Sequence, residues 1–194
     1  MRPTRILSLC DKTGIWSEPY KRAGYEVVRI DLQRGADQDV RLLPFDPRGF
    51  RGIIAQPPCT HFAGSGARWW KGKGQAALLE ALALADACLR AVAIYRPAWW
   101  VLENPVGRLT GFLGKPRFTF HPNEFAGWAA ASLAESERYT KRTCLWGNFT
   151  EPERRPLSPV LGSKMHLLPP GPERANLRSQ TPTGFAAAFA EANA

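Results

Sequence analysis

The sequence predicts an α/β fold in which helices flank a single, mainly parallel sheet. The first observation is an apolar strand pattern, a glycine-containing turn, a helix pattern and a second strand pattern within residues 5–31. The second is a pair of apolar strand patterns, at 52–55 and 99–102, separated by the longest helix pattern of the chain. The third is size: 194 residues with 44% hydrophobic content can bury one core, so we expect a single domain over 1–194.

The first elements have the plan of a nucleotide- or adenosine-binding βαβ unit. We expect a strand at 5–9, a turn that contains Gly14, a helix at 16–23 with Ser17 as its N-cap, and a strand at 26–30. This strand ends at Asp31, where an acid can accept hydrogen bonds from ribose hydroxyls. The same residues fit equally well a plain βαβ unit with an aspartate on its surface.

A buried strand at 52–55 then ends in Pro57-Pro58-Cys59. Two prolines cannot extend a helix or donate to a ladder, so the backbone leaves the sheet as a stiff turn. A lone cysteine is more often a small buried hydrophobe. The carboxyl end of a strand in an open α/β sheet is, however, where reactive groups lie, and core packing does not need that stiffness. We therefore predict that Cys59 is a reactive thiol.

Residues 64–74 are rich in glycine and contain three cations and two adjacent tryptophans. Solvated loops rarely expose two tryptophans, so this pair packs on the core or touches a ligand, and contact with bases is one such use. We expect a mobile loop here, followed by a helix at 75–95 that Arg96-Pro97 ends. The next strand, at 99–102, is expected to end in Glu103-Asn104-Pro105.

The remainder of the chain gives weaker signals. We expect irregular structure at 107–128, a short helix at 129–136 and a strand at 139–149. Six prolines predict an extended segment over about 150–180. A last helix is expected to begin with Thr181 as N-cap and Pro182 in its first turn.

The net charge and the cysteine pattern indicate which kinds of partner, metal site and disulfide to expect. The net charge of +9 favours a polyanionic partner, most commonly nucleic acid. Four separated cysteines without a Cys-x-x-Cys pair predict neither a disulfide framework nor a metal site. No run of about twenty apolar residues predicts a membrane span, and the absence of an apolar leader predicts a cytoplasmic protein. The sequence leaves the oligomeric state open.

Pro-Pro-Cys and Glu-Asn-Pro, each at the end of an apolar strand, resemble the carbon-5 cytosine-specific DNA methyltransferase family. In that family the Pro-Cys loop carries the nucleophile and the Glu-Asn pair recognises the base. The resemblance covers roughly residues 5–149. It implies a Rossmann-like S-adenosylmethionine-dependent methyltransferase fold and a short form of the phage and prophage type. The proline-rich segment stands where relatives have a large target-recognition domain.

The resemblance also implies roles for individual residues. Tyr139–Phe149 is similar to the family's arginine strand, which places Arg142 at the carbonyl oxygen of the base. The implied catalytic residues are Cys59, Glu103 and Arg142, with S-adenosylmethionine as the methyl donor and DNA, double- or single-stranded, as the substrate. The implied S-adenosylmethionine-binding residues are Cys10, Asp11, Thr13, Gly14, Ile15, Asp31, Leu32, Asp39, Val40, Pro57 and Leu84. The expected nucleic-acid-binding residues are His61, Arg68, Trp69, Trp70, Lys71, Lys73 and Lys141.

The chain departs from the family at two places: Lys12 stands where the first glycine of the cofactor turn is expected, and two polar positions before Arg142 differ. Three alternatives stay open. The substrate is RNA or a free nucleotide; the chain is a non-catalytic nucleic-acid-binding module; or it is a cysteine hydrolase with His61 as its base. The intact Cys59 and Glu103 speak against the second, and the lack of a nearby acid for His61 speaks against the third.

Overall fold

The computed structural model describes residues 4–171 and 173–194, which form two compact units. The first unit contains the chain up to Gly14, then Gly24–Thr119 and Thr143–Phe149. The second contains Ile15–Ala23, Phe120–Arg142 and Thr150–Ala194. Each is described by itself below, and the expectation of one domain stays a prediction.

The sheet has six strands in the order β2-β1-β3-β4-β6-β5. The strands are β1 (Arg5–Leu9), β2 (Glu26–Ile30), β3 (Gly52–Ala55), β4 (Trp99–Pro105), β5 (Phe118–Phe120) and β6 (Thr143–Asn148). β1 pairs in parallel with both β2 and β3, β3 pairs in parallel with β4, and β6 runs antiparallel to β4. The prediction of an α/β fold with a mainly parallel sheet and flanking helices is therefore confirmed.

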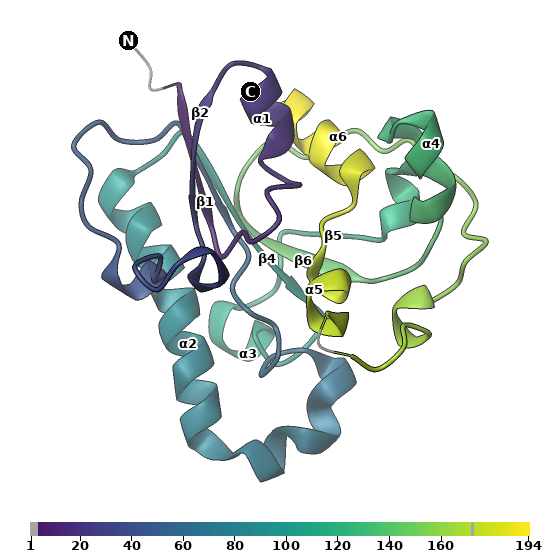
Figure 1. Cartoon of the computed structure of the whole chain (residues 1–194), viewed down its shortest axis with the longest axis horizontal. Helices are drawn as coiled ribbons and strands as arrows, with labels where there is room; N and C mark the ends of the chain where they lie inside the picture. The colour runs from purple at the N-terminus through teal and green to yellow at the C-terminus, as the bar shows by residue number, and fades with distance from the viewer. Residues whose placement is uncertain (1–3, 172) are drawn as a thin grey trace. The chain divides into compact units, whose positions relative to one another are not determined.

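Burial explains the composition of the parallel strands. Every residue of β1 and β3 is buried, which accounts for their nearly continuous apolar sequences. β2 is the edge strand, and it carries the charged side chains of Glu26 and Arg29. Figure 1 shows β1 and β2 side by side in purple. Alternation along β4 buries Leu102 and Asn104 and leaves Glu103 partly exposed between them.

The helices of the first unit connect and cover these strands. They are η1 (Leu32–Arg34), η2 (Val40–Leu42), η3 (Gly64–Trp69), α2 (Trp70–Tyr95) and α3 (Thr110–Leu113). α2 contributes Ala81, Cys88 and Ala91 to a core that also contains Leu7, Ile53 and Leu102. This core holds β3 and β4 in place, and their carboxyl ends carry Cys59 and Glu103.

The prediction of a mobile loop at residues 64–74 is wrong, because these residues are mostly helical. η3 and the first turn of α2 occupy this range. The predicted helix start at Gln75 coincides with a break inside α2, where Gly74 has φ 74° and ψ −176°. Figure 1 shows the two helical parts, η3 in blue and the long part of α2 in teal, joined by a sharp bend.

Two strand boundaries also differ from the expectation. β4 continues through Pro105 instead of ending at Leu102, because its last residues pair with β6 up to Pro105 opposite Thr143. β6 begins only at Thr143, so Arg142 and the residues before it lie outside the strand. Residues 107–128 also contain α3 and β5, which the sequence patterns do not predict.

Apart from Phe120 of β5, the described residues of the second unit form only helices and connecting segments. The helices are α1 (Glu18–Arg22), η4 (Pro122–Glu124), η5 (Ala126–Trp128), α4 (Ala131–Ala134), η6 (Glu135–Glu137), η7 (Lys164–His166), α5 (Arg174–Ser179) and α6 (Thr183–Asn193). Phe185 of α6 stacks on Phe120 at a centroid distance of 3.9 Å and meets Trp16 edge-on at 5.1 Å. These aromatic contacts form the centre of the unit.

The predicted helices of this unit are present with shifted ends. Ser17 occupies the expected N-cap position of α1, but its side chain makes no capping hydrogen bond. The N-cap of α6 is Pro182 and not Thr181. The buried carboxylate of Glu137 caps α6 instead, since it accepts hydrogen bonds from the backbone N–H groups of Thr183 and Gly184. The proline-rich segment contains α5, which its composition does not predict.

Among the described residues, no helix has both the length and the apolar composition that crossing a membrane requires.

Candidate functional site at the carboxyl ends of β1, β3 and β4

The strand order places a topological switch point between β1 and β3. From β1 the chain proceeds to β2 on one side, and it later returns to add β3 and β4 on the other. In open α/β sheets, ligands bind outside the carboxyl ends of the strands at such a point. The segments that leave β1, β2 and β3 begin at Cys10, Asp31 and Gln56, and Glu103 lies near the carboxyl end of β4.

The turn after β1 is held by the carboxylate of Asp11. Its Oδ2 accepts a hydrogen bond from Ser8 Oγ at 2.7 Å, and its Oδ1 accepts one from Gly14 N at 2.6 Å. Asp11 is only 2% exposed. Arg29 crosses from β2 and donates to the carbonyl oxygen of Asp11 at 3.1 Å. The Asp11 side chain therefore shapes this turn rather than facing a ligand.

Gly14 is required by geometry. Its φ is 74°, and a Cβ there would lie 2.6 Å from Nη1 of Arg29. Lys12 and Thr13 of the same turn are exposed. Ile15 belongs to the second unit.

Asp31 is the predicted ribose-binding acid. It lies at the carboxyl end of β2 and is partly exposed, and its Oδ1 accepts a hydrogen bond from Gln33 N at 2.7 Å. Within the part of the chain that the structure describes, its second oxygen has no hydrogen-bond partner. That oxygen can accept a hydrogen bond from a ligand, and exposed Leu32 lies beside it in the chain.

The carboxylate of Asp39 is hydrogen-bonded to Arg41. It accepts from Arg41 Nε at 3.0 Å and from the backbone N of Arg41 at 2.9 Å. These hydrogen bonds to Arg41 hold the pKa of Asp39 below its usual value. The carboxylate is thus an anion with its partner already in place.

The apolar residues predicted to contact the cofactor share one hydrophobic cluster. Val40 is buried in it, and Cys10 and Leu84 pack against it. Cys88 of α2 belongs to the same cluster, and a hydrogen bond to Cys10, together with burial, raises the pKa of the Cys88 thiol. The structure therefore brings Cys10, Val40 and Leu84 together, although they are distant in sequence.

The loop of residues 57–63 that follows β3 is called the Cys59 loop. Cys59 is partly exposed, whereas Cys88 and Cys144 are buried. Its carbonyl oxygen accepts hydrogen bonds from the backbone N atoms of Phe62 and Ala63, both at 2.9 Å. Phe62 is fully buried and anchors the loop. Cys59 is therefore not a core cysteine, and it begins a turn at the edge of the sheet.

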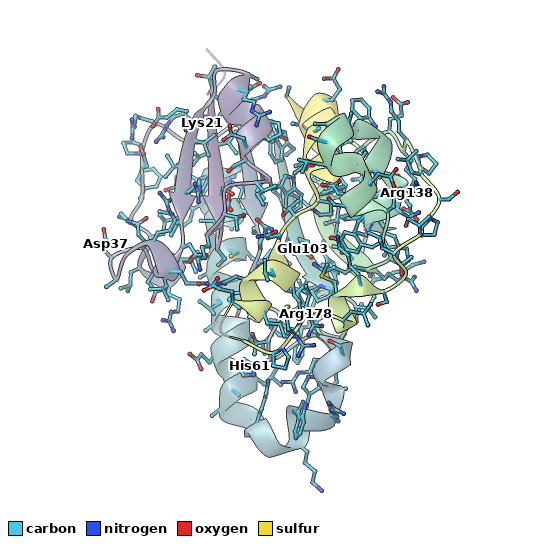
Figure 2. The ribbon with its side chains drawn as sticks, turned by 45° about the vertical axis from the view of Figure 1, so that its right-hand side comes forward. Lys21, Asp37, His61, Glu103, Arg138 and Arg178 are labelled. Atoms are coloured by element: carbon cyan, nitrogen blue, oxygen red, sulfur yellow. The ribbon has the colours of Figure 1, made fainter. Side chains whose placement is uncertain are left out.

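Asn104 joins the Cys59 loop to the end of β4. Its Nδ2 donates to the carbonyl oxygen of Pro57 at 2.9 Å, and the residue is 0% exposed. β3 and β4 are adjacent, with Ala55 opposite Leu102. The partly exposed Glu103 thus lies on the strand next to the one that leads into the Cys59 loop. Figure 2 labels Glu103 and His61 of this region.

A second connection lies further along both segments. Ala63 and Gly107 form an antiparallel bridge. Gly64 N donates to Val106 O at 2.8 Å, and Arg108 N donates to Phe62 O at 2.9 Å. A Cβ at Gly107 would lie 1.9 Å from Phe62 O, so only glycine allows this approach.

The residues of η3 and α2 that are predicted to bind nucleic acid divide into two groups. Arg68, Trp69 and Lys71 are exposed, with Trp69 at 58%. Lys73 donates from Nζ to Thr60 O at 2.9 Å, and Trp70 packs under the guanidinium of Arg108 at 4.7 Å from ring centroid to Cζ. Neither tryptophan belongs to the hydrophobic core cluster, which favours the second of the two alternatives, contact with a ligand.

The two remaining predicted residues belong to the second unit. Lys141 donates from Nζ to the carbonyl oxygen of Arg178 at 2.8 Å. Arg142 is partly exposed and directly precedes β6 in the chain. The expectation that Arg142 lies on a strand is therefore wrong.

Sequence analysis missed two residues of this region, Gly107 and Arg108. The spacing after Glu103-Asn104-Pro105 offers a signal only for Gly107, since a glycine just past a strand end marks a turn or a close approach. Nothing in the pattern distinguishes Arg108 from other loop arginines. No group of three or more His, Cys, Asp or Glu side chains within the described residues could hold a metal ion.

Comparisons with known proteins give a fold-level likeness of limited extent. No protein-family model and no curated protein sequence matches this chain. One matching solved structure is a prophage-encoded protein of E. coli, provisionally described as a DNA modification methyltransferase. It is 15% identical with a TM-score of 0.45, and the match covers 74% of this chain and 45% of that one.

Proposed function

We propose that this protein is a DNA (cytosine-5-)-methyltransferase that works through a covalent adduct between Cys59 and the base. The observation that carries the proposal is the hydrogen bond from Asn104 to the Pro57 carbonyl. It ties a strand end that presents a carboxylate to a stiff loop that presents a partly exposed thiol. A thiol and a carboxylate on adjacent strand ends are the two groups that covalent activation of cytosine needs.

In this proposal Cys59 is the nucleophile. Cytosine carbon 5 is a poor nucleophile by itself, and addition of the Cys59 thiolate to carbon 6 makes the ring enamine-like. Protonated Glu103 donates its proton to the ring nitrogen and accepts a hydrogen bond from the amino group, so the proton neutralises the negative charge that builds on the ring. The sulfur leaves when the proton on carbon 5 is removed. Arg142 belongs to the second unit, and the role that the resemblance implies for it stays a prediction.

S-adenosylmethionine, when bound, supplies the electrophilic methyl group. The residues fit it at the ribose end, because Asp31 presents a carboxylate oxygen without a partner among the described residues at the carboxyl end of β2. The apolar cluster with Val40 and Leu84 offers a surface for the adenine ring. The side chain of Arg29 lies against the turn at Gly14, so S-adenosylmethionine would contact the backbone of this turn.

The substrate in this proposal is a cytosine outside the base stack. A base inside a duplex cannot meet the thiol, so it is flipped out or supplied single-stranded. The net charge of +9 and the exposed Arg68, Trp69 and Lys71 favour a nucleic-acid strand over a free nucleotide. The short proline-rich segment supports low sequence specificity, because base-edge contacts need a structure to present them.

The hydrolase alternative lacks an orienting partner for its base. His61 is two residues from Cys59, but its buried Nδ1 has no hydrogen-bond partner among the described residues. An RNA substrate and a non-catalytic role remain outcomes of the test below.

The direct test is incubation with S-adenosylmethionine labelled in its methyl group. Unmodified plasmid DNA, a single-stranded DNA and an RNA of the same sequence serve as parallel substrates. The proposal predicts labelled 5-methylcytosine after nuclease digestion of a DNA substrate. Label in the RNA alone would move the activity to RNA, and no transfer to any substrate would leave only a binding function.

A further inference from the structure

Arg108 holds the downstream part of the Cys59 loop. Its Nε donates to the carbonyl oxygen of His61 at 2.6 Å, and its backbone N donates to Phe62 O. Asn104 holds the upstream end of the same loop through Pro57 O. The loop is therefore held on one side of Cys59 by β4 and on the other side by the segment that follows β4.

The same guanidinium also contacts the first turn of α2. Its Cζ lies 4.7 Å from the ring centroid of Trp70, within the range of a cation–π contact. Lys73, from that turn, donates to Thr60 O on the Cys59 loop. Two side chains thus connect the start of α2 to the backbone within two residues of Cys59.

Several polar atoms around Arg108 are buried without a hydrogen-bond partner in the described chain. They are Arg108 Nη2, Trp70 Nε1 and His61 Nδ1. Unpaired buried polar atoms are rare in native proteins, and each costs about 1–3 kcal/mol. These three atoms lie on the residues that Arg108 links: Arg108 itself, its stacking partner Trp70 and its acceptor His61.

A break in helical geometry separates residues 64–73 from the long part of α2. Gly74 breaks the helical geometry at its end with φ 74° and ψ −176°, and no atom lies within 4 Å of a Cβ built there. The exposed Trp69 and Arg68 lie on this segment, and Arg68 stacks over Trp69 at 5.0 Å. A strand that contacts Trp69 would therefore act on the Cys59 loop through Trp70 and Arg108.

We propose that Arg108 is a positioning residue that couples the Trp69-Trp70 segment to the placement of the Cys59 thiol. This inference rests on the proposed function, because it assigns the thiol as the reacting group and nucleic acid as the partner of Trp69. Lysine cannot replace this arginine: it keeps the charge but cannot donate from a fixed fork and stack on an indole at the same time.

The test compares Arg108→Lys with Arg68→Lys as its matched control. Both arginines stack on a tryptophan, but only Arg108 is hydrogen-bonded to the Cys59 loop in the described structure. The readout is the rate at which iodoacetamide alkylates Cys59 in the free protein, followed by peptide mass spectrometry. Arg108→Lys should raise this rate about 3- to 10-fold, the size of one lost cation–π contact. Arg68→Lys should leave the rate at the wild-type value.

A second pair of variants separates coupling from misfolding. Trp70→Phe keeps an aromatic face under the guanidinium and should alkylate like the wild type, whereas Trp70→Ala should follow Arg108→Lys. Thermal unfolding of all four variants shows whether they are folded. Equal alkylation of Trp70→Phe and Trp70→Ala in folded protein would overturn the coupling.

A third measurement distinguishes positioning from a plain phosphate contact. A positioning role predicts that Arg108→Gln lowers the methyl-transfer kcat and leaves the salt slope of DNA binding unchanged. A slope reduced by about one, with Cys59 alkylation unchanged, identifies Arg108 as a phosphate contact and overturns the proposal. If the wild type transfers no methyl group, the proposed function fails, while the alkylation rates still decide whether Arg108 positions the thiol.

Discussion

At the scale of single residues, the predicted cofactor-binding carboxylates differ in how many of their oxygens already accept hydrogen bonds within the protein. Asp11 and Asp39 use their oxygens on neighbouring groups. Asp31 uses one oxygen on Gln33 N, and its other oxygen has no partner among the described residues. Three acids that the sequence presents alike therefore have different roles.

Asp31→Ala should weaken binding of S-adenosylmethionine by about 1–3 kcal/mol, the usual cost of losing a hydrogen bond to a charged group. Asp37→Ala is the matched control, because Asp37 lies in the same loop and is exposed. Isothermal titration calorimetry measures both affinities. Equal affinities in the two variants would remove Asp31 from the cofactor site.

Asn104→Ala should lower the free energy of unfolding by about 1–3 kcal/mol, because the buried carbonyl of Pro57 loses its donor. Urea denaturation measures the change, and Asn123→Ala, which removes an amide that is only partly buried, is the comparison. A loss no larger than that of Asn123→Ala would show that the Asn104 bond does not hold the Cys59 loop.

At the scale of elements, the approach of the Cys59 loop to the segment after β4 depends on a glycine. Gly107→Ala would place a Cβ 1.9 Å from Phe62 O, which forces the two segments apart. Gly66→Ala is the matched control, since no atom lies within 4 Å of a Cβ there and its φ is not in the left-handed range. Hydrogen exchange of residues 57–64 should accelerate in Gly107→Ala and stay at the wild-type rate in Gly66→Ala. Unchanged exchange in Gly107→Ala would mean that the bridge does not hold the loop.

An ion-pair network at the amino end of β1 gives a pH prediction. Hydrogen bonds to Arg48, with a contribution from Arg5, hold the pKa of Asp46 well below its usual value of about 3.9. A carboxyl group with a depressed pKa in the folded state adds stability that is complete above its unfolded pKa and is lost as the pH falls. Asp46→Asn should therefore be less stable than the wild type at pH 7, and the difference should shrink below about pH 4. Thermal unfolding between pH 2 and pH 7 measures it, and a constant difference would contradict the assignment.

At the scale of the whole molecule, charge and the short proline-rich segment act together. Phosphate contacts give affinity without sequence information, so a net charge of +9 predicts DNA binding that weakens steeply as salt rises. We expect methylation at many cytosines, with at most one or two neighbouring bases preferred. Bisulfite sequencing of treated plasmid checks this, and modification confined to one motif of four or more base pairs would contradict it.

The sequence predicts the central strands well because their signals are local. β1, β2 and β3 have the predicted bounds, since buried parallel strands are short apolar runs with turn residues at their ends. It misses the end of β4 and the start of β6, because their pairing with each other sets these bounds. Glycines at 64, 66 and 72 predict a loop where contacts with Gly107 and Arg108 hold helical turns.

In the candidate site, too, residues in local motifs can be predicted, whereas residues whose role depends on distant contacts cannot. Cys59 and Glu103 can be predicted because each follows a strand pattern within a short motif. Arg108 cannot, because its role depends on His61 and Trp70, which lie far from it in sequence. The sequence likewise cannot show that one oxygen of Asp31 accepts a hydrogen bond from Gln33 N, because this depends on the backbone conformation after β2.

The measurement that tests the central claim most directly is covalent trapping of a DNA that contains 5-fluorocytosine. Fluorine at carbon 5 cannot leave as a proton does, so an adduct formed at carbon 6 persists after methyl transfer. Wild-type protein with S-adenosylmethionine should form a denaturation-resistant complex, with mass spectrometry locating the linkage at Cys59. Cys59→Ser should form none, while Cys88→Ser, if folded, should trap like the wild type. A wild-type protein that methylates cytosine without trapping, or a Cys59→Ser variant with full activity, would contradict the account.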